Sequence, residues 1–163
     1  MDQSDDDFFA NLPATRGAAG GLIRSTSGDV LLVRRVYDPE RPWGIPGGIM
    51  EADESPVAAC RREIAEELGV TARVLAPLVI DWVPSRPPRT AAYQWLFRVE
   101  VPHTDFRLQP DELSGWEWVP PSRLSEHLAA GTARRLEAAV SVDDQGLGLV
   151  YLEDGHAVLP ART

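Results

Sequence analysis

Residues 48–70 constrain the fold of this chain more than any other segment, because they combine a glycine turn with a well-delimited helix. Ser55 is a good helix N-cap, and Pro56 suits the first helical position. Gly69 stands where a left-handed C-terminal cap would fall. The pattern therefore predicts one helix between Ser55 and Gly69, entered from a turn at Gly47-Gly48.

This helix has two different faces. Three carboxylates occupy positions i, i+3 and i+4 and are neighbours on one face: Glu63, Glu66 and Glu67. At about 100° per residue, the apolar Val57, Ile64 and Leu68 cluster on another face that can be buried. Mg²⁺ and Mn²⁺ prefer such oxygen ligands. The alternative is a solvated acidic face, since like charges at this spacing cost only about 0.2–0.5 kcal/mol per pair.

The whole register resembles the Nudix box of the Nudix hydrolase family. That box reads Gly, five residues, Glu, seven residues, then Arg-Glu-apolar-x-Glu-Glu-x-Gly-apolar. The matching positions are Gly48, Glu54, Arg62, Glu63, Ile64, Glu66, Glu67, Gly69 and Val70. One departure lies nearby: many members have glycine just before the first glutamate, and this chain has Asp53.

The resemblance implies an α/β/α sandwich with a mixed β-sheet and hydrolysis of a diphosphate linkage with Mg²⁺ or Mn²⁺. The implied metal ligands are the Gly48 carbonyl, Glu63, Glu66 and Glu67. Either Glu63, Glu67 or Glu112 is the general base, which takes a proton from the attacking water. Arg62 and Glu54 are interpreted as a pair that positions the ligating glutamates.

Five further residues are candidates outside the box. Glu112 precedes the strand expected at residues 115–119, and a family glutamate on the corresponding loop often serves as a metal ligand or base; a solvent-exposed turn is the alternative. The candidates for substrate binding are Arg34, Arg35, Trp43 and Arg86. Arg34 and Arg35 have a plain alternative as solvated strand ends, and Trp43 has one as a packing anchor.

Composition narrows the function classes. The net charge of −9 argues against a nucleic-acid groove, and bound cations would reconcile it with a phosphate substrate. All sixteen basic residues are arginine, which excludes lysine chemistry and indicates a GC-rich, bacterial genome. Cys60, the single cysteine, permits no internal disulfide and is expected as a packed thiol.

The expected organisation is an acidic N-terminal tail at residues 1–13, interpreted as mobile, and a single domain at 14–163. Strands are predicted at residues 17–24, 30–36, 71–83, 91–101 and 115–119. Helices are predicted near 121–129 and 132–140, and a hairpin at 147–158 turns about Asp154-Gly155. Pro77 implies an edge or a bulge. No leader or membrane span is recognised, so a cytoplasmic protein is expected.

The substrate class stays open at this stage. The expected partner is a small nucleotide, with no nucleic acid and no membrane, and a homodimer is left open. Compact length favours a nucleoside triphosphate, whereas Pro84 is a weak sign of ADP-ribose or a nucleotide sugar. A non-catalytic nucleotide sensor on the same fold is the alternative of another class. A purely structural acidic helix leaves the glycine register unexplained.

Overall fold

A computed structural model describes residues 5–160 of the chain. Residues 1–4 of the expected tail lie outside this range. The strands are β1 Arg16–Leu22, β2 Val30–Arg35, β3 Trp43–Gly44, β4 Gly47–Ile49, β5 Arg73–Val83, β6 Ala92–Glu100, β7 Leu113–Val119, β8 Val150–Glu153 and β9 His156–Ala157. The helices are α1 Asp5–Ala10, α2 Pro56–Leu68, the 3₁₀ turn η1 Pro121–Arg123, α3 Leu124–His127 and α4 Ala130–Gln145.

The strands form two sheets. The larger has six strands in the order β4-β1-β6-β5-β8-β9, with parallel pairs β1–β6 and β5–β8 and antiparallel pairs elsewhere. The smaller one has the order β3-β2-β7 and is antiparallel. A mixed sheet was expected, and it is confirmed. Although β1 and β2 are consecutive, they join different sheets after the Ser25–Asp29 turn.

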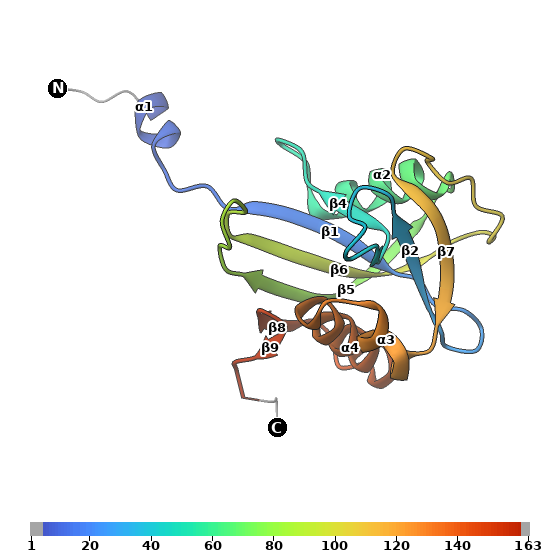
Figure 1. Cartoon of the computed structure of the whole chain (residues 1–163). Helices are drawn as coiled ribbons and strands as arrows, with labels where there is room; N and C mark the ends of the chain where they lie inside the picture. Colours follow the sequence, from blue (N-terminus) through green and yellow to red (C-terminus); the bar gives the residue numbers. More distant parts are fainter. Residues whose placement is uncertain (1–4, 161–163) are drawn as a thin grey trace.

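Two helices cover opposite faces of the large sheet (Figure 1). On the α2 side, Ile64 and Leu68 pack with Ala19, Phe97 and other buried residues. On the α4 side, Leu136 and Val140 pack with Leu22, Val79 and Leu96. Alternate residues of one strand thus enter the two cores, as the period of two requires. The result is the predicted α/β/α sandwich.

The local signals of the sequence are confirmed where short-range chemistry decides the structure. The Ser55 side chain accepts a hydrogen bond from Ala58 N–H, and Gly69 ends α2 with a left-handed φ of 67°. Asp154 and Gly155 have φ values of 53° and 78°, as a type I′ turn between β8 and β9 requires. The register of β5 against β6 shifts on both sides of Pro77, which identifies the expected bulge.

Three details differ from expectation. The tail contains the short helix α1, whose Phe8 and Phe9 are exposed and which projects from the body (Figure 1). The last helix begins at Ala130 and extends to Gln145, beyond the expected end at residue 140. The loop expected at 37–48 contains strand β3, and the glycine turn expected at Gly47-Gly48 is instead the first part of strand β4, which pairs with β1. In the described part of the chain, no helix combines the length and apolarity needed to cross a membrane.

Candidate functional site

The site is built where Gly47 and Gly48 of strand β4 face helix α2. A Cβ atom on Gly48 would lie 2.5 Å from the Glu63 carboxyl carbon, so any other residue here would require that carboxylate to move. Gly47 N–H donates to Glu67 Oε2 at 2.9 Å. A Cβ on Gly47 would lie 2.3 Å from the Ala19 carbonyl oxygen, and its φ of 143° is rarely adopted by other residues. Gly47 is therefore required by the backbone, and Gly48 leaves the Glu63 carboxylate in its observed position.

Arg62 organises the carboxylates of the helix. Its Nε and Nη2 donate to Glu54 Oε1 and Oε2 at 2.8 and 2.9 Å, which is a two-point ion pair. Its Nη1 donates to Glu63 Oε1 at 2.8 Å and, at 3.3 Å, to Glu66 Oε2. Nη2 also reaches the Ile49 carbonyl at 3.1 Å. One guanidinium thus connects strand β4, the loop and the helix.

The charges of the site shift the acid strengths of its carboxyls. Two hydrogen bonds from Arg62 lower the pKa of Glu54 to about 2. Burial raises the pKa of Glu67 to about 8; Glu63 and Glu112 raise it further, while Gly47 N–H and Arg35 oppose the shift. Burial also raises the pKa of Glu63, against the opposing effect of Arg62. The structure therefore crowds negative charge that a cation would relieve.

The donor set fits a hard divalent cation in its chemistry, because it consists of carboxylate oxygens and the backbone of β4. Glu67 is buried at 2% exposure, whereas the Glu66 side chain is 56% exposed, so the helix offers both an inner and an outer carboxylate. Within residues 5–160, no three His, Cys, Asp or Glu side chains are already gathered around one point. Hydrogen bonds from Arg62 to Glu63 and from Gly47 N–H to Glu67 occupy one oxygen of each carboxylate.

Glu112 lies close enough to influence both buried glutamates. Its charge raises the pKa of Glu63 and of Glu67. Its backbone carbonyl accepts from Val36 N–H at 2.8 Å, which fixes the loop against the end of β2. The structure thus brings the sequence-predicted Glu112 to the box helix, although 45 residues separate it from Glu67. A role as ligand or base stays a prediction.

A cleft of about 1050 Å³ opens beside strand β4. Gly47 and Gly48 line it, together with the small residues Ala18, Gly20 and Ala92. Among the described residues, seven arginines line the cleft: Arg16, Arg35, Arg41, Arg86, Arg89, Arg134 and Arg135. The acidic residues lining it are Asp38 and Asp154. A strongly cationic cleft therefore lies in a chain whose net charge is −9.

The four residues predicted to bind substrate separate into two pairs. Arg35 and Arg86 line the cleft. Arg34 is exposed and donates to Ser114 Oγ at 3.3 Å, and it is not part of the cleft lining. Trp43 packs against a core cluster and makes an edge-to-face contact with His127, with ring centroids 5.8 Å apart. Trp43 therefore occupies the position of a packing anchor, which was the alternative to substrate binding.

Arg35 connects the cleft to the buried glutamate. Its attraction lowers the pKa of Glu67, and its Nε is buried with no hydrogen-bond partner among the described residues. A Cβ on Gly44 would lie 2.5 Å from the Arg35 guanidinium, so the strand β3 makes room for this side chain. A guanidinium with free donors beside the carboxylates suits a phosphate oxygen.

Arg135 forms a buried pair on the α4 side of the cleft. Its Nε donates to Asp81 Oδ2 at 2.7 Å, and Asp81 Oδ1 accepts from Gly155 N–H at 3.0 Å. Asp81 is fully buried. This pair ties β5, α4 and the β8–β9 turn together, so the charge of Arg135 is balanced within the protein.

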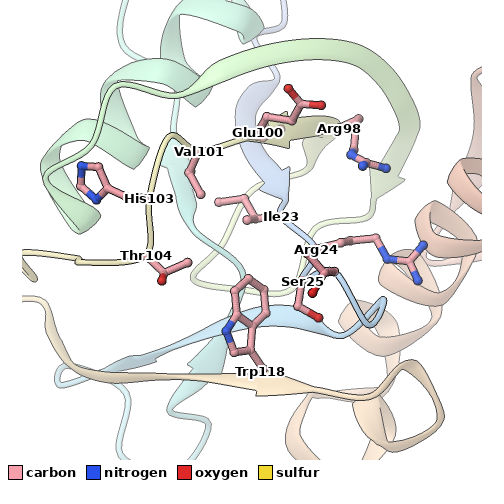
Figure 2. Close-up of a pocket in the computed structure, with 11 residues that line it drawn as sticks. Ile23, Arg24, Ser25, Arg98, Glu100, Val101, His103, Thr104 and Trp118 are labelled. Carbon is pink, nitrogen blue, oxygen red and sulfur yellow. The ribbon is translucent and has the colours of Figure 1, made fainter.

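A second, smaller hollow of about 320 Å³ lies at the other ends of β1 and β6, between the two sheets (Figure 2). Arg24, Arg98, His103 and Trp118 are among its lining residues. Its two guanidiniums are engaged by aspartates of α4: Arg24 pairs with Asp143 and Asp144, and Arg98 with Asp143. This hollow contains none of the predicted site residues.

Sequence reasoning missed several residues of the site. Gly47 was recognised only as part of a turn, yet its N–H holds Glu67. Five cleft arginines were also missed: Arg16, Arg41, Arg89, Arg134 and Arg135. They come from four separate segments, and no local pattern distinguishes them from surface arginines. For Arg16 alone, the sequence offers an indication: alternation along β1 places it on the same face as Ala18 and Gly20.

The chain is similar to several known proteins. The NUDIX domain family matches residues 14–140. An RNA pyrophosphohydrolase of Gluconacetobacter diazotrophicus is 29% identical over 140 residues, covering 72% of this chain and 83% of that protein. A UDP-X diphosphatase structure superposes with a TM-score of 0.69 at 18% identity, covering 93% and 75% of the two chains. A MutT protein from Methanosarcina mazei gives 0.65 at 22%, covering 83% and 98%.

Proposed function

Because the chain belongs to the NUDIX family of hydrolases, we propose that it cleaves a diphosphate bond in a nucleotide-type substrate with Mg²⁺ or Mn²⁺. One observation carries this proposal. Gly47 and Gly48 of β4 touch the Glu67 and Glu63 carboxylates and also line the arginine-rich cleft. A diphosphate in the cleft would therefore lie next to the carboxylates of the box helix.

We assign a role to each residue of the site from its position. Glu63, Glu66, Glu67, Glu112 and the Gly48 carbonyl are the proposed metal ligands. A divalent cation, when bound, neutralises phosphate oxygens and makes a water easier to deprotonate.

Three carboxylates are candidates for the base that accepts the proton: Glu63, Glu67 and Glu112. Burial raises the pKa of Glu67, and a divalent cation bound beside it would lower that pKa again and favour the carboxylate form that can accept a proton.

Charged neighbours support the substrate and the ligands in different ways. Arg35, which lies beside Glu67 and has free donors, is proposed to hold a phosphate oxygen. The N–H groups of Arg62 already donate to Glu54, Glu63, Glu66 and the Ile49 carbonyl. Arg62 and Glu54 therefore act through the carboxylates that they position. They are therefore positioning residues rather than substrate contacts.

The substrate proposal is a nucleoside triphosphate or a related small nucleotide, with ADP-ribose or a nucleotide sugar as the alternative. The similar proteins include an RNA pyrophosphohydrolase and a UDP-X diphosphatase, whose names share a diphosphate bond and differ in what it joins. A cleft of about 1050 Å³ is larger than a diphosphate needs and leaves room for a nucleoside and more.

The deciding experiment is hydrolysis of a nucleotide panel with Mg²⁺, with Mn²⁺ and with EDTA. We expect turnover only with a divalent cation. Glu66→Gln and Glu67→Gln remove charge and keep volume, so they should abolish most turnover in a folded protein. Glu137→Gln, on the exposed face of α4, is the matched control and should be silent. Full activity in both box variants would overturn the site assignment, and nucleotide binding without turnover would favour a sensor.

A further inference from the structure

The far end of the cleft carries more positive charge than a single diphosphate uses. Arg86 and Arg89 face each other in a tight loop, where each backbone N–H donates to the other residue's carbonyl, at 2.9 and 2.8 Å. Directly opposed residues of this kind have neighbouring side chains, and like charges there are destabilising. The juxtaposition therefore has a cost that a bound anion would relieve.

Arg16 extends this cluster. Its Nε donates to Thr90 Oγ1 at 2.8 Å and its Nη2 donates to the Thr90 carbonyl at 2.6 Å. These bonds place Arg16 beside the Arg89-Thr90 segment and give its side chain a fixed position. Arg16, Ala18 and Gly20 alternate along β1 and all line the cleft, so Arg16 belongs to the cleft face of the strand.

At this end of the cleft, Asp154 is the acidic residue that lies next to the arginines. Asp154 Oδ2 accepts from Arg86 Nη2 at 2.6 Å, and the Asp154 carbonyl accepts from Arg134 Nη2 at 2.9 Å. Asp154 thus contacts Arg86 and Arg134, whereas Arg16 bonds only to Thr90 and Arg89 has no side-chain partner among the described residues. We call Arg16, Arg86, Arg89 and Arg134 the distal arginine cluster.

The cluster lies at a defined distance from the box. Gly48 pairs with Ala19 of β1, and Arg16 lies three residues before Ala19 on the same strand. Three residues of strand span about 10 Å. Ala18, which lies between them on the same face of β1 as Arg16, also lines the cleft. This spacing is of the order of one nucleoside, which is longer than a diphosphate alone.

We propose that the distal arginine cluster binds a second anionic group of the substrate, so that the preferred substrate is a nucleotide carrying a phosphate on its ribose in addition to the 5′-diphosphate. This inference rests on the proposed function for the position of the diphosphate. It goes further by specifying a second charge on the other side of the nucleoside. A free ribose phosphate and a phosphodiester to a further group present the same chemistry to the cluster.

The test is equilibrium binding of two product-like probes that differ by one phosphate, AMP and adenosine 3′,5′-bisphosphate, measured by titration calorimetry with Mg²⁺. The bisphosphate should bind about tenfold tighter or more, since charge-assisted contacts of this kind are each worth that factor. A third probe, the dinucleotide pApA, distinguishes a phosphodiester from a terminal phosphate. Raised salt should reduce the preference.

The variant is Arg86→Gln/Arg89→Gln, whose two side chains are exposed and leave the core intact. It should lose most of the preference for the bisphosphate, with AMP affinity changed less than about twofold. Arg123→Gln is the control, because Arg123 pairs with Glu126 on the surface outside the cleft.

Two results overturn the proposal: equal or undetectable binding of both probes to the unaltered protein, or a preference that the double variant retains. Hydrolysis of coenzyme A and of its 3′-dephospho form is measured separately. Cleavage of either without a binding preference leaves the proposed hydrolase function intact and removes only the second anion site. A binding preference without any cleavage across the panel removes the hydrolase function instead.

Discussion

Arg62 of helix α2 and Glu54, which precedes the helix, form a two-point ion pair with Nε–Oε1 and Nη2–Oε2 distances of 2.8 and 2.9 Å. The same guanidinium donates to Glu63 at 2.8 Å. Its fork geometry therefore matters more than its charge, because a lysine ammonium cannot reproduce two parallel bonds and a third one.

The first prediction follows from this pair. Arg62→Lys should lower kcat by about 10–100-fold and change KM less, because the damage is to the placement of catalytic carboxylates. Steady-state kinetics at saturating Mg²⁺ measures both constants. Arg61→Lys, at the exposed neighbouring position, is the matched control. An unchanged kcat for Arg62→Lys would show that Arg62 is an ordinary surface residue.

The second prediction concerns the space at Gly48. A Cβ there would meet the Glu63 carboxylate at 2.5 Å, so Gly48→Ala should displace that side chain and lower turnover by about 10–100-fold. Gly115→Ala is the matched control, since nothing lies within 4 Å of its Cβ position. Melting temperatures of both variants establish that the loss is local. Equal activity of the two variants would mean that Glu63 can yield without functional cost.

The third prediction uses the pKa of Glu67, raised to about 8 by burial from an ordinary 4.5. A carboxyl whose pKa is raised on folding stabilises the fold below its unfolded pKa, and that stability is lost as pH rises through the folded pKa. In EDTA, the melting temperature should therefore fall between about pH 4.5 and pH 8.

Glu67→Gln should flatten this profile, because the glutamine has no charge to bury. Divalent cations compete with the proton, so added Mg²⁺ should raise the melting temperature most at the alkaline end. Thermal melts across the pH range, with EDTA and with Mg²⁺, supply the comparison. A profile that is the same in Glu67→Gln would assign the pH dependence to other groups.

The fourth prediction concerns Cys60. Its side chain is fully buried, and burial raises the pKa of the thiol to about 12. The native protein should therefore react with a thiol reagent such as DTNB far more slowly than the protein in guanidinium chloride. Stoichiometric labelling of the folded protein at neutral pH would contradict this. Cys60→Ala should keep activity and lose stability, because Cys60 packs in the α2 core.

Sequence reasoning succeeds here where short-range chemistry determines the structure. Ser55 and Gly69 delimit α2 through hydrogen bonds within one turn, and Asp154-Gly155 requires two left-handed residues. The spacing of Glu63 and Glu67 on one helix likewise fixes their proximity without any tertiary information. These features could be predicted because each one depends on residues a few positions apart.

The features that escaped prediction depend on long-range arrangement. Whether β2 pairs with β1 or with β7 is decided by packing, and it pairs with β7. Arg34 and Arg35 are adjacent, yet a register shift between them coincides with Arg35 lining the cleft and Arg34 lying outside it. Arg16, Arg89 and Arg134 converge only because β1, the β5–β6 loop and α4 meet. No periodicity in the sequence encodes that meeting.

Every basic residue of the chain is an arginine, and this affects how the pH dependence of its reaction rate is interpreted. Arginine side chains stay protonated at every pH at which a protein remains folded, so the cleft keeps a constant positive potential where a lysine-lined cleft would begin to lose it. The chain holds no lysine. Changes of rate at alkaline pH therefore report the titration of the box carboxylates, the reacting water or the substrate. The charge of the cleft arginines stays constant over the same range and does not contribute to those changes.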